Sequence, residues 1–138
     1  MTATSSIEFN VADEQFFRID DVERFPDGSG YVGRIFLRSG SFSLHSYKFY
    51  FDDLDEFLSQ ARQLYDTLSG TAHLRHPYER NHLSISATSR GNVSVAGHFE
   101  LFDGETQRLQ CSFTADQTFL PAFIRTLEQV SRELDVEA

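Results

Sequence analysis

The sequence predicts an α+β fold, in which two α-helices pack on one face of a curved antiparallel β-sheet of about seven or eight strands. Alternating apolar and polar residues recur in two sets of short segments, and an amphipathic helical pattern follows each set. The expected order is therefore strands, helix, strands, helix. Connections between neighbouring strands are too short for parallel crossovers, so the pairing is expected to be antiparallel. Fourteen Phe against one Met and no Trp favour strands and an aromatic core.

The first set of segments predicts a four-stranded meander. A polar lead-in, residues 1–6, is expected to be frayed and flexible. Residues 25–30 combine Pro and Gly in a turn or loop, and Gly40 supplies a tight reversal before the fourth strand. The expected strands cover residues 7–11, 16–22, 31–37 and 41–51.

A helix is expected to follow the meander and to end near Gly70. Asp53, with Glu56 three residues later, fits a capping box, and Asp52 is an equally good N-cap. Gly70 stands where a left-handed C-terminal cap belongs. Apolar residues recur at intervals of three and four, which gives one apolar face: Leu54, Phe57, Leu58, Ala61, Leu64, Tyr65 and Leu68.

The second set of segments predicts further strands and a final helix. Pro77 falls in a loop at 75–81, and the pair Asp103-Gly104 is a strong hairpin signal. Thr118 is expected to cap the last helix, with Pro121 in its first turn. The expected strands cover 71–74, 82–88, 93–101 and 109–113, with Phe99, Leu101, Leu109, Cys111 and Phe113 facing inward. The apolar side of the helix consists of Phe119, Leu120, Phe123, Ile124, Leu127, Val130 and Leu134.

Length and charge restrict the classes of partner. At 138 residues without an internal linker, the chain is expected to form one domain, residues 1–138. It has 21 acidic and 12 basic residues, a net charge of −9, and a single lysine, Lys48. Phosphate groups of nucleic acids require clustered Lys and Arg, so neither nucleic acid nor an anionic membrane is an expected partner. Acidity attracts basic protein surfaces, and it also simply keeps a small protein in solution.

The expected location is the cytoplasm. No apolar run approaches the roughly 20 residues that span a bilayer. The N-terminal residues lack the basic start and apolar stretch of a signal peptide. Cys111 is the only cysteine, so no internal disulfide is expected.

A histidine group is the first candidate for chemistry. His73, His76 and His82 lie close together in sequence, and His98 and Cys111 fall in strands that could bring them near. A zinc site needs ligands that converge on one point, usually at tight fixed spacings. This spacing does not ensure convergence, so surface histidines are the favoured interpretation and no metal is expected.

Other candidates also have structural interpretations. The acids Asp52, Asp53, Asp55 and Glu56 could perform acid–base work or hold Mg²⁺. Acids in a first helical turn are favoured anyway by capping and by the helix dipole. Cys111 is expected to be a buried and inert thiol. No nucleophile elbow, phosphate loop or zinc motif is present, so we expect neither an enzyme nor a cofactor.

Exposed aromatic residues beside acids are the remaining candidates. Phe102 lies out of phase with its inward neighbours and is flanked by Asp103 and Glu105 at the expected hairpin tip. Tyr78 and Glu79 form a second aromatic–acidic pair on a loop. Such pairs suit recognition of a basic protein partner, although single exposed aromatics are also common without a function. These five residues are the predicted partner-binding residues.

Several segments of the chain resemble those of the WapI family of bacterial immunity proteins. Residues 53–58 (DLDEFL) and 64–70 (LYDTLSG) are similar to the central helix of that family. The resemblance extends over most of the chain from about Tyr31 onward. It includes the strand pair at 34–38 (RIFLR) and 40–43 (GSFS), the distal segment 91–97 (GNVSVAG), and the start of the last helix at 113–121 (FTADQTFLP).

The resemblance implies a cytoplasmic antitoxin that binds and blocks the nuclease end of a contact-delivered toxin. Because the family has no shared catalytic set, it assigns no roles to individual residues. The acidic charge suits this function, since the phosphate-binding surface of a nuclease is basic. A small-ligand or regulatory binding domain, with a pocket between sheet and helices, is the alternative from another class.

Overall fold

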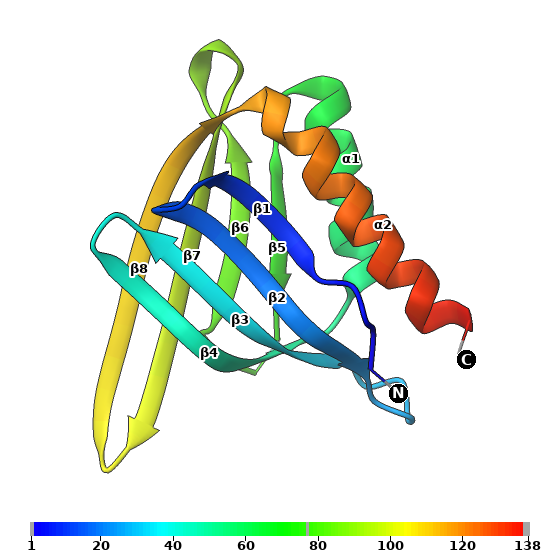
Figure 1. Cartoon of the computed structure of the whole chain (residues 1–138), viewed down its shortest axis with the longest axis vertical. Helices are drawn as coiled ribbons and strands as arrows, with labels where there is room; N and C mark the ends of the chain where they lie inside the picture. The colour runs from blue at the N-terminus through cyan, green and yellow to red at the C-terminus, as the bar shows by residue number, and fades with distance from the viewer. Residues whose placement is uncertain (1, 77, 137–138) are drawn as a thin grey trace.

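Figure 1 shows the computed structural model of the chain, which describes residues 2–76 and 78–136. Its elements follow the predicted order of strands, helix, strands, helix, so the α+β class is confirmed. The predicted loop residue Pro77 lies outside the described residues. The strands are β1 Ile7–Ala12, β2 Gln15–Arg24, β3 Tyr31–Ser39, β4 Phe42–Phe51, β5 Thr71–Arg75, β6 His82–Ala87, β7 Asn92–Asp103 and β8 Glu105–Asp116; the helices are α1 Leu54–Thr67 and α2 Leu120–Val136.

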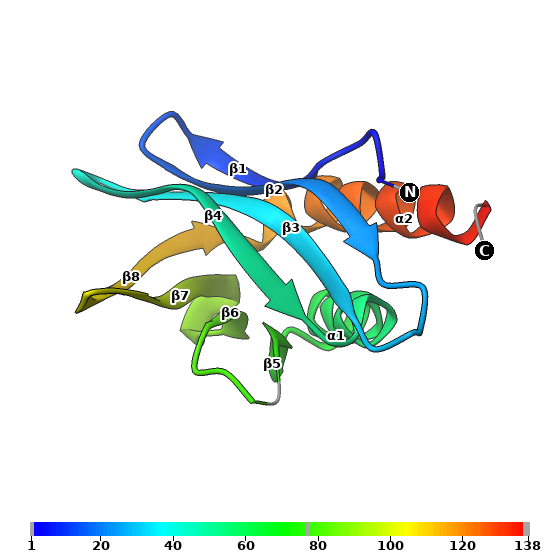
Figure 2. The ribbon, with the colours of Figure 1, turned by 90° about the horizontal axis from the view of Figure 1, so that it is seen from below.

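Within the described residues the eight strands divide between two antiparallel sheets, with the orders β1-β2-β3-β4 and β5-β6-β7-β8. Figure 2 shows the two sheets as two layers, with both helices along one side. α2 packs against β1, α1 packs against β5, and the helices contact each other. In the sequence α1 lies between β4 and β5, and Asp52, just after β4, donates its N–H to the Arg75 carbonyl of β5 at 3.0 Å.

One hydrophobic core fills the space between the sheets and the helices. Phe123 of α2 lies at its centre, with ring centroids 5.3 Å from Phe9, 5.5 Å from Phe17 and 5.9 Å from Phe57. These four rings come from both helices and from the first sheet, and all are buried. The predicted aromatic core is therefore confirmed, and it joins segments that are distant in the sequence.

The start of α1 follows the prediction, and its end does not. The Asp53 carboxylate accepts a hydrogen bond from the Glu56 N–H at 2.9 Å, which confirms the cap. The left-handed C-terminal cap is Leu68, with φ 52°, instead of Gly70. Its N–H bonds to the Leu64 carbonyl at 2.8 Å and closes the last turn two residues early. Tyr65 and Leu68 were predicted to belong to the apolar face, but both are exposed and lie outside the buried face of α1.

The start of α2 also differs from the prediction. A short 3-10 turn, Gln117–Phe119, precedes the helix, and Asp116 caps this turn by accepting the Thr118 N–H at 2.8 Å. Thr118 is therefore capped and does not itself act as the cap. Pro121 lies in the first turn of α2, as predicted, where its missing N–H removes no helical hydrogen bond.

Residues 2–6 are held against the fold, in contrast to the expected frayed lead-in. Ala3 is buried, and its N–H bonds to the Val22 carbonyl at 2.8 Å. Thr4 and Ser5 donate hydrogen bonds to the Glu133 carboxylate on α2, the Thr4 N–H at 2.8 Å and the Ser5 N–H at 2.9 Å. The polar composition of this segment predicted fraying. The local sequence could not reveal the acceptor, Glu133, which lies 128 residues from Ser5. In the described part of the chain, no helix is long and apolar enough to cross a membrane.

Candidate partner-binding groove

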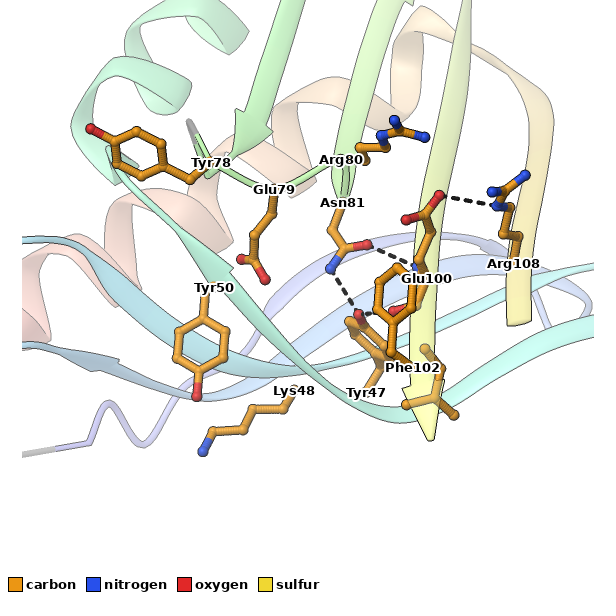
Figure 3. Close-up of a pocket in the computed structure, with 11 residues that line it drawn as sticks. Tyr47, Lys48, Tyr50, Tyr78, Glu79, Arg80, Asn81, Glu100, Phe102 and Arg108 are labelled. Atoms are coloured by element: carbon orange, nitrogen blue, oxygen red, sulfur yellow. Dashed lines mark hydrogen bonds and ion pairs between the residues drawn. The ribbon is translucent and has the colours of Figure 1, made fainter. Parts of the chain in front are cut away.

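A groove of 610 Å³ lies where the first sheet meets the far end of the second, and we call it the hairpin groove (Figure 3). Strand β4 forms one side, the loop between β5 and β6 forms another, and the β7–β8 hairpin closes it. The residues that line it are Tyr47, Lys48, Tyr50, Tyr78, Glu79, Arg80, Asn81, Glu100, Leu101, Phe102 and Arg108.

Three hydrogen bonds among Tyr47, Asn81 and Glu100 build the floor of the groove. The Asn81 amide donates to the Tyr47 hydroxyl at 2.8 Å and accepts the Glu100 N–H at 2.8 Å. The Tyr47 hydroxyl in turn donates to the Glu100 carbonyl at 2.5 Å. Figure 3 shows these bonds joining the side chains of Tyr47 in β4 and Asn81 in the β5–β6 loop to the backbone of Glu100 in β7. The network therefore fixes three separate segments at one point.

Asn81 acts as an extension of strand β6. The β6–β7 ladder begins at the pair His82–His98, so Glu100 lies beyond the last backbone partner. The Asn81 side chain supplies the acceptor that another β6 residue would have supplied. Burial raises the pKa of Tyr47, opposed by the hydrogen bond from Asn81, so the phenol stays protonated and can donate.

Glu100 is a buried acid that the sequence did not single out. Its side chain is 7% exposed, and its Oε1 lies 3.2 Å from Arg108 Nε and 3.2 Å from His98 Nε2. A buried carboxylate requires such partners because burial without them is costly. The predicted hairpin turn contained the signal: a turn at Gly104 sets the register that places Glu100 opposite Arg108.

The groove collects predicted residues that lie far apart in the sequence. Tyr78 is 91% exposed and Phe102 is 73% exposed. Both line the groove together with Glu79, and Figure 3 shows the two rings on different sides of it. The other two predicted residues, Asp103 and Glu105, do not line the groove. They oppose each other at the exposed hairpin tip, next to Phe102.

The prediction that Leu101 faces inward is wrong. Its position in the alternating pattern predicted an inward side chain, but the residue is 48% exposed. The pattern continues through Leu101, whereas β6 ends its pairing with β7 at His98. Phe99 and Glu100 are still buried, but residues 101–108 of the hairpin extend past the core, so a residue on its inner face there has no layer to cover it. Leu101 thus adds apolar surface to the groove.

Comparison with known families assigns the chain. The model of the WapI-like immunity protein family matches residues 2–135. The chain belongs to this family. The match confirms the resemblance seen in the sequence and extends it over β1 and β2, and membership implies an immunity protein directed against a toxin. Searches of curated proteins and of solved structures gave no significant match.

The candidate histidines of this immunity protein lie at two separate places. His73, His82 and His98 line a second cavity of 440 Å³, and the His82 and His98 rings stack with centroids 5.7 Å apart. His76 lies instead against Tyr78. Cys111 packs towards the core, and burial raises the pKa of its thiol. Among residues 2–76 and 78–136, no group of three or more His, Cys, Asp or Glu is placed to hold a metal ion.

The acidic cluster at the start of α1 has structural roles. Asp53 caps the helix, as described above. The Asp55 carboxylate accepts a hydrogen bond from the Ser131 hydroxyl on α2 at 3.2 Å, which links the two helices.

In the second cavity, burial lowers the pKa of His73, and the charges of Arg75 and His82 lower it further.

Proposed function

We propose that this chain is a non-enzymatic, cytoplasmic immunity protein that binds and neutralises a nuclease toxin domain. The family match over residues 2–135 carries the proposal, because it implies a toxin as partner. The net charge of −9 supports a nuclease in particular. A nuclease holds phosphates on a basic surface, and an acidic inhibitor can occupy such a surface and associate with it rapidly.

We further propose that the toxin domain binds at the hairpin groove and the adjacent tip, through Phe102, Asp103, Glu105, Tyr78 and Glu79. The two rings are among the most exposed large side chains of the described chain, and exposed aromatics frequently anchor protein interfaces. The hydrogen-bonded floor holds the segments that carry them in place. A preformed site of this kind loses less conformational freedom on binding.

The state of the buried polar groups supports binding in preference to catalysis. Glu100 is already engaged by Arg108 and His98, and its backbone is engaged by Asn81 and Tyr47. A catalytic carboxylate must instead face a substrate at hydrogen-bonding distance. The polar groups of the floor satisfy one another, and the exposed rim is available to a protein surface.

The test begins with the reading frames beside the one that encodes this chain, where the proposal expects a large protein with a basic, nuclease-like C-terminal domain. Co-expression of that domain with this chain should restore growth, and a purified, catalytically inactivated toxin domain should be captured by the immobilised immunity protein. A variant that carries Tyr78→Ser and Phe102→Ser should fold and lose both effects. Killing that continues despite co-expression of folded immunity protein would contradict the proposal.

The volume of the groove favours one second candidate, a small-ligand or regulatory binding domain. At 610 Å³, the groove falls within the range of about 300–1,000 Å³ that is typical of small-molecule sites. A thermal-shift screen over metabolites tests this candidate, because a ligand that binds only the folded state raises the unfolding midpoint. A metabolite that raises the midpoint by several degrees, and fails to do so with Phe102→Ser, would support it.

A further inference from the structure

The edges of the two sheets are protected to different degrees. On the outer edge of β1, the Glu8 N–H donates to the Thr126 hydroxyl of α2 at 3.0 Å. On the outer edge of β5, the His73 N–H donates to the Gln60 side-chain oxygen of α1 at 2.9 Å. Each helix therefore supplies a side chain that occupies the edge of the strand beside it.

Strand β4 is protected in another way. Its pairing with β3 shifts register between the pairs Ile35–Tyr47 and Leu37–Leu44, and Ser46 at this shift has φ 52°. It also carries Lys48, the only lysine of the chain. Irregular pairing and an edge lysine both discourage another strand from pairing there.

Strand β8 is protected at one place, where the Ser39 hydroxyl bonds to the Ser112 carbonyl, and residues 105–110 lack these protections. It pairs with β7 through twelve consecutive residues without a register shift. It contains neither lysine nor proline, and its residues 105–108 are exposed. A long and regular edge of this kind is a template for another strand.

The available backbone groups of β8 can be identified from its neighbours. In an antiparallel ladder, successive residues direct their N–H and C=O groups to opposite edges. The Ser112 carbonyl accepts a bond from the Ser39 hydroxyl at 3.0 Å, so Ser112 faces away from β7. By the same alternation, Thr106, Arg108 and Gln110 also face away from β7. Within the described part of the chain, no group bonds to their backbone N–H or C=O.

We propose that the toxin domain adds one of its own edge strands to β8, along Thr106–Gln110. This inference rests on the proposed function and specifies how binding occurs. The segment continues directly from Phe102, Asp103 and Glu105, so an added strand would also meet an exposed ring and two acids. A strand with basic side chains, as expected for a nuclease domain, complements that surface. Main-chain pairing supplies affinity, and the side chains supply selectivity.

Proline substitution on the outer register tests the proposal. Thr106→Pro and Gln110→Pro each delete an outward N–H that does not take part in the β7–β8 ladder, and proline is tolerated at such edge positions. Each should weaken binding of the inactivated toxin domain by about tenfold, the loss expected for one interface hydrogen bond. The matched variants Thr106→Ala and Gln110→Ala keep the N–H and should bind within about twofold of the wild type. Circular dichroism and the unfolding midpoint report whether the proline variants fold.

Hydrogen exchange on the wild-type protein provides a measurement that does not depend on folding of the variants. Binding of the toxin domain should slow exchange at the amides of Thr106, Arg108 and Gln110. The alternate amides of Gln107 and Leu109 already bond to β7, so their exchange should change much less. Protection confined to the outward amides supports strand addition, and unchanged exchange at all three overturns it.

The other outcomes are distinguishable. A wild-type protein that does not bind the toxin domain overturns the proposed function and this inference together. Tight binding that neither proline reduces overturns strand addition alone. A wild-type dimer in light scattering that Thr106→Pro converts to a monomer assigns the edge to a second copy of this chain, and also overturns the proposal.

Discussion

Aromatic residues and strand edges are covered on one side of the molecule and exposed on the other. The helices close the first side, and the β7–β8 hairpin forms the open end. On the closed side, Phe123 is buried among other rings, and helix side chains occupy the edges of β1 and β5. At the open end, Phe102 and Tyr78 are exposed, and the edge of β8 is unprotected along residues 105–110. The difference indicates that stability resides mainly at the closed side, and it is the reason why we propose the open end as the binding site.

The largest expected difference in stability is between truncation of one aromatic ring on the closed side and truncation of one at the open end. Phe123→Ala removes a buried ring that contacts three others, and we expect a loss of about 3–5 kcal/mol in the free energy of unfolding. Phe102→Ala removes an exposed ring, and the loss should stay within about 0.5 kcal/mol. Urea denaturation of both variants measures this. Similar losses at the two positions would contradict the division.

The floor of the groove should show an intermediate effect on stability. Asn81→Ala leaves the buried Glu100 N–H without an acceptor and removes a donor to Tyr47, so we expect a loss of about 1–3 kcal/mol. Tyr47→Phe removes only the hydroxyl and should cost less. Toxin binding should weaken in Asn81→Ala even where the protein is fully folded, because the rim loses its support. Unchanged stability and unchanged binding would show that the network is dispensable.

The contact between the N-terminal segment and α2 should depend on pH. Hydrogen bonds from Ser5, first its hydroxyl and then its N–H, lower the pKa of Glu133 from 4.5 to about 2. A pKa lowered by folding contributes stability above the unfolded value, and this contribution is lost as the pH falls through the folded value. The stability difference between wild type and Glu133→Gln should therefore be full above pH 4.5 and should vanish as the pH approaches 2.

Matched urea titrations across that pH window provide the measurement, and Ser5→Ala is the companion variant. It removes the strongest donor to Glu133 and should reduce the same pH dependence. A difference between wild type and Glu133→Gln that stays constant from pH 4.5 down to 2 would show that the carboxylate does not anchor the segment.

Charge reversal at the hairpin tip should have the smallest effect on stability and a clear effect on association. Asp103→Lys combined with Glu105→Lys changes exposed side chains at a turn, so the unfolding midpoint and circular dichroism should not change. Association with a basic toxin domain should slow, and its salt dependence should weaken, because rim charges mainly set the association rate. An unaltered rate across salt concentrations would place the interface elsewhere.

Much of the fold could be predicted because it depends on local patterns. Alternation identified the strands, and the cap at Asp53 identified the start of α1. Two caps were mispredicted, at Gly70 and at Thr118, because neighbouring residues, Leu68 and Asp116, satisfied the helix ends first. Helix ends are decided by small differences between adjacent candidates, which composition alone does not resolve.

The candidate site was predictable only in part. The sequence indicated Phe102 and Tyr78 separately, from their phase and their acidic neighbours. It did not indicate that Tyr78, Glu79 and Phe102 line one groove, because this depends on where the β5–β6 loop crosses the end of β7. It also did not indicate Glu100, whose burial results from Arg108, His98 and Asn81 together.

The sequence by itself therefore determined the strands and helices, their order, the aromatic core and the acidic charge, since each follows from local periodicity or composition. The tertiary structure alone decided that the strands divide into two sheets, that helix side chains occupy the edges of β1 and β5, and that residues 105–110 of β8 are left open. These features depend on contacts between residues distant in the chain. Local patterns specify which face of an element is apolar, and only packing of the whole chain decides what covers each face and each edge.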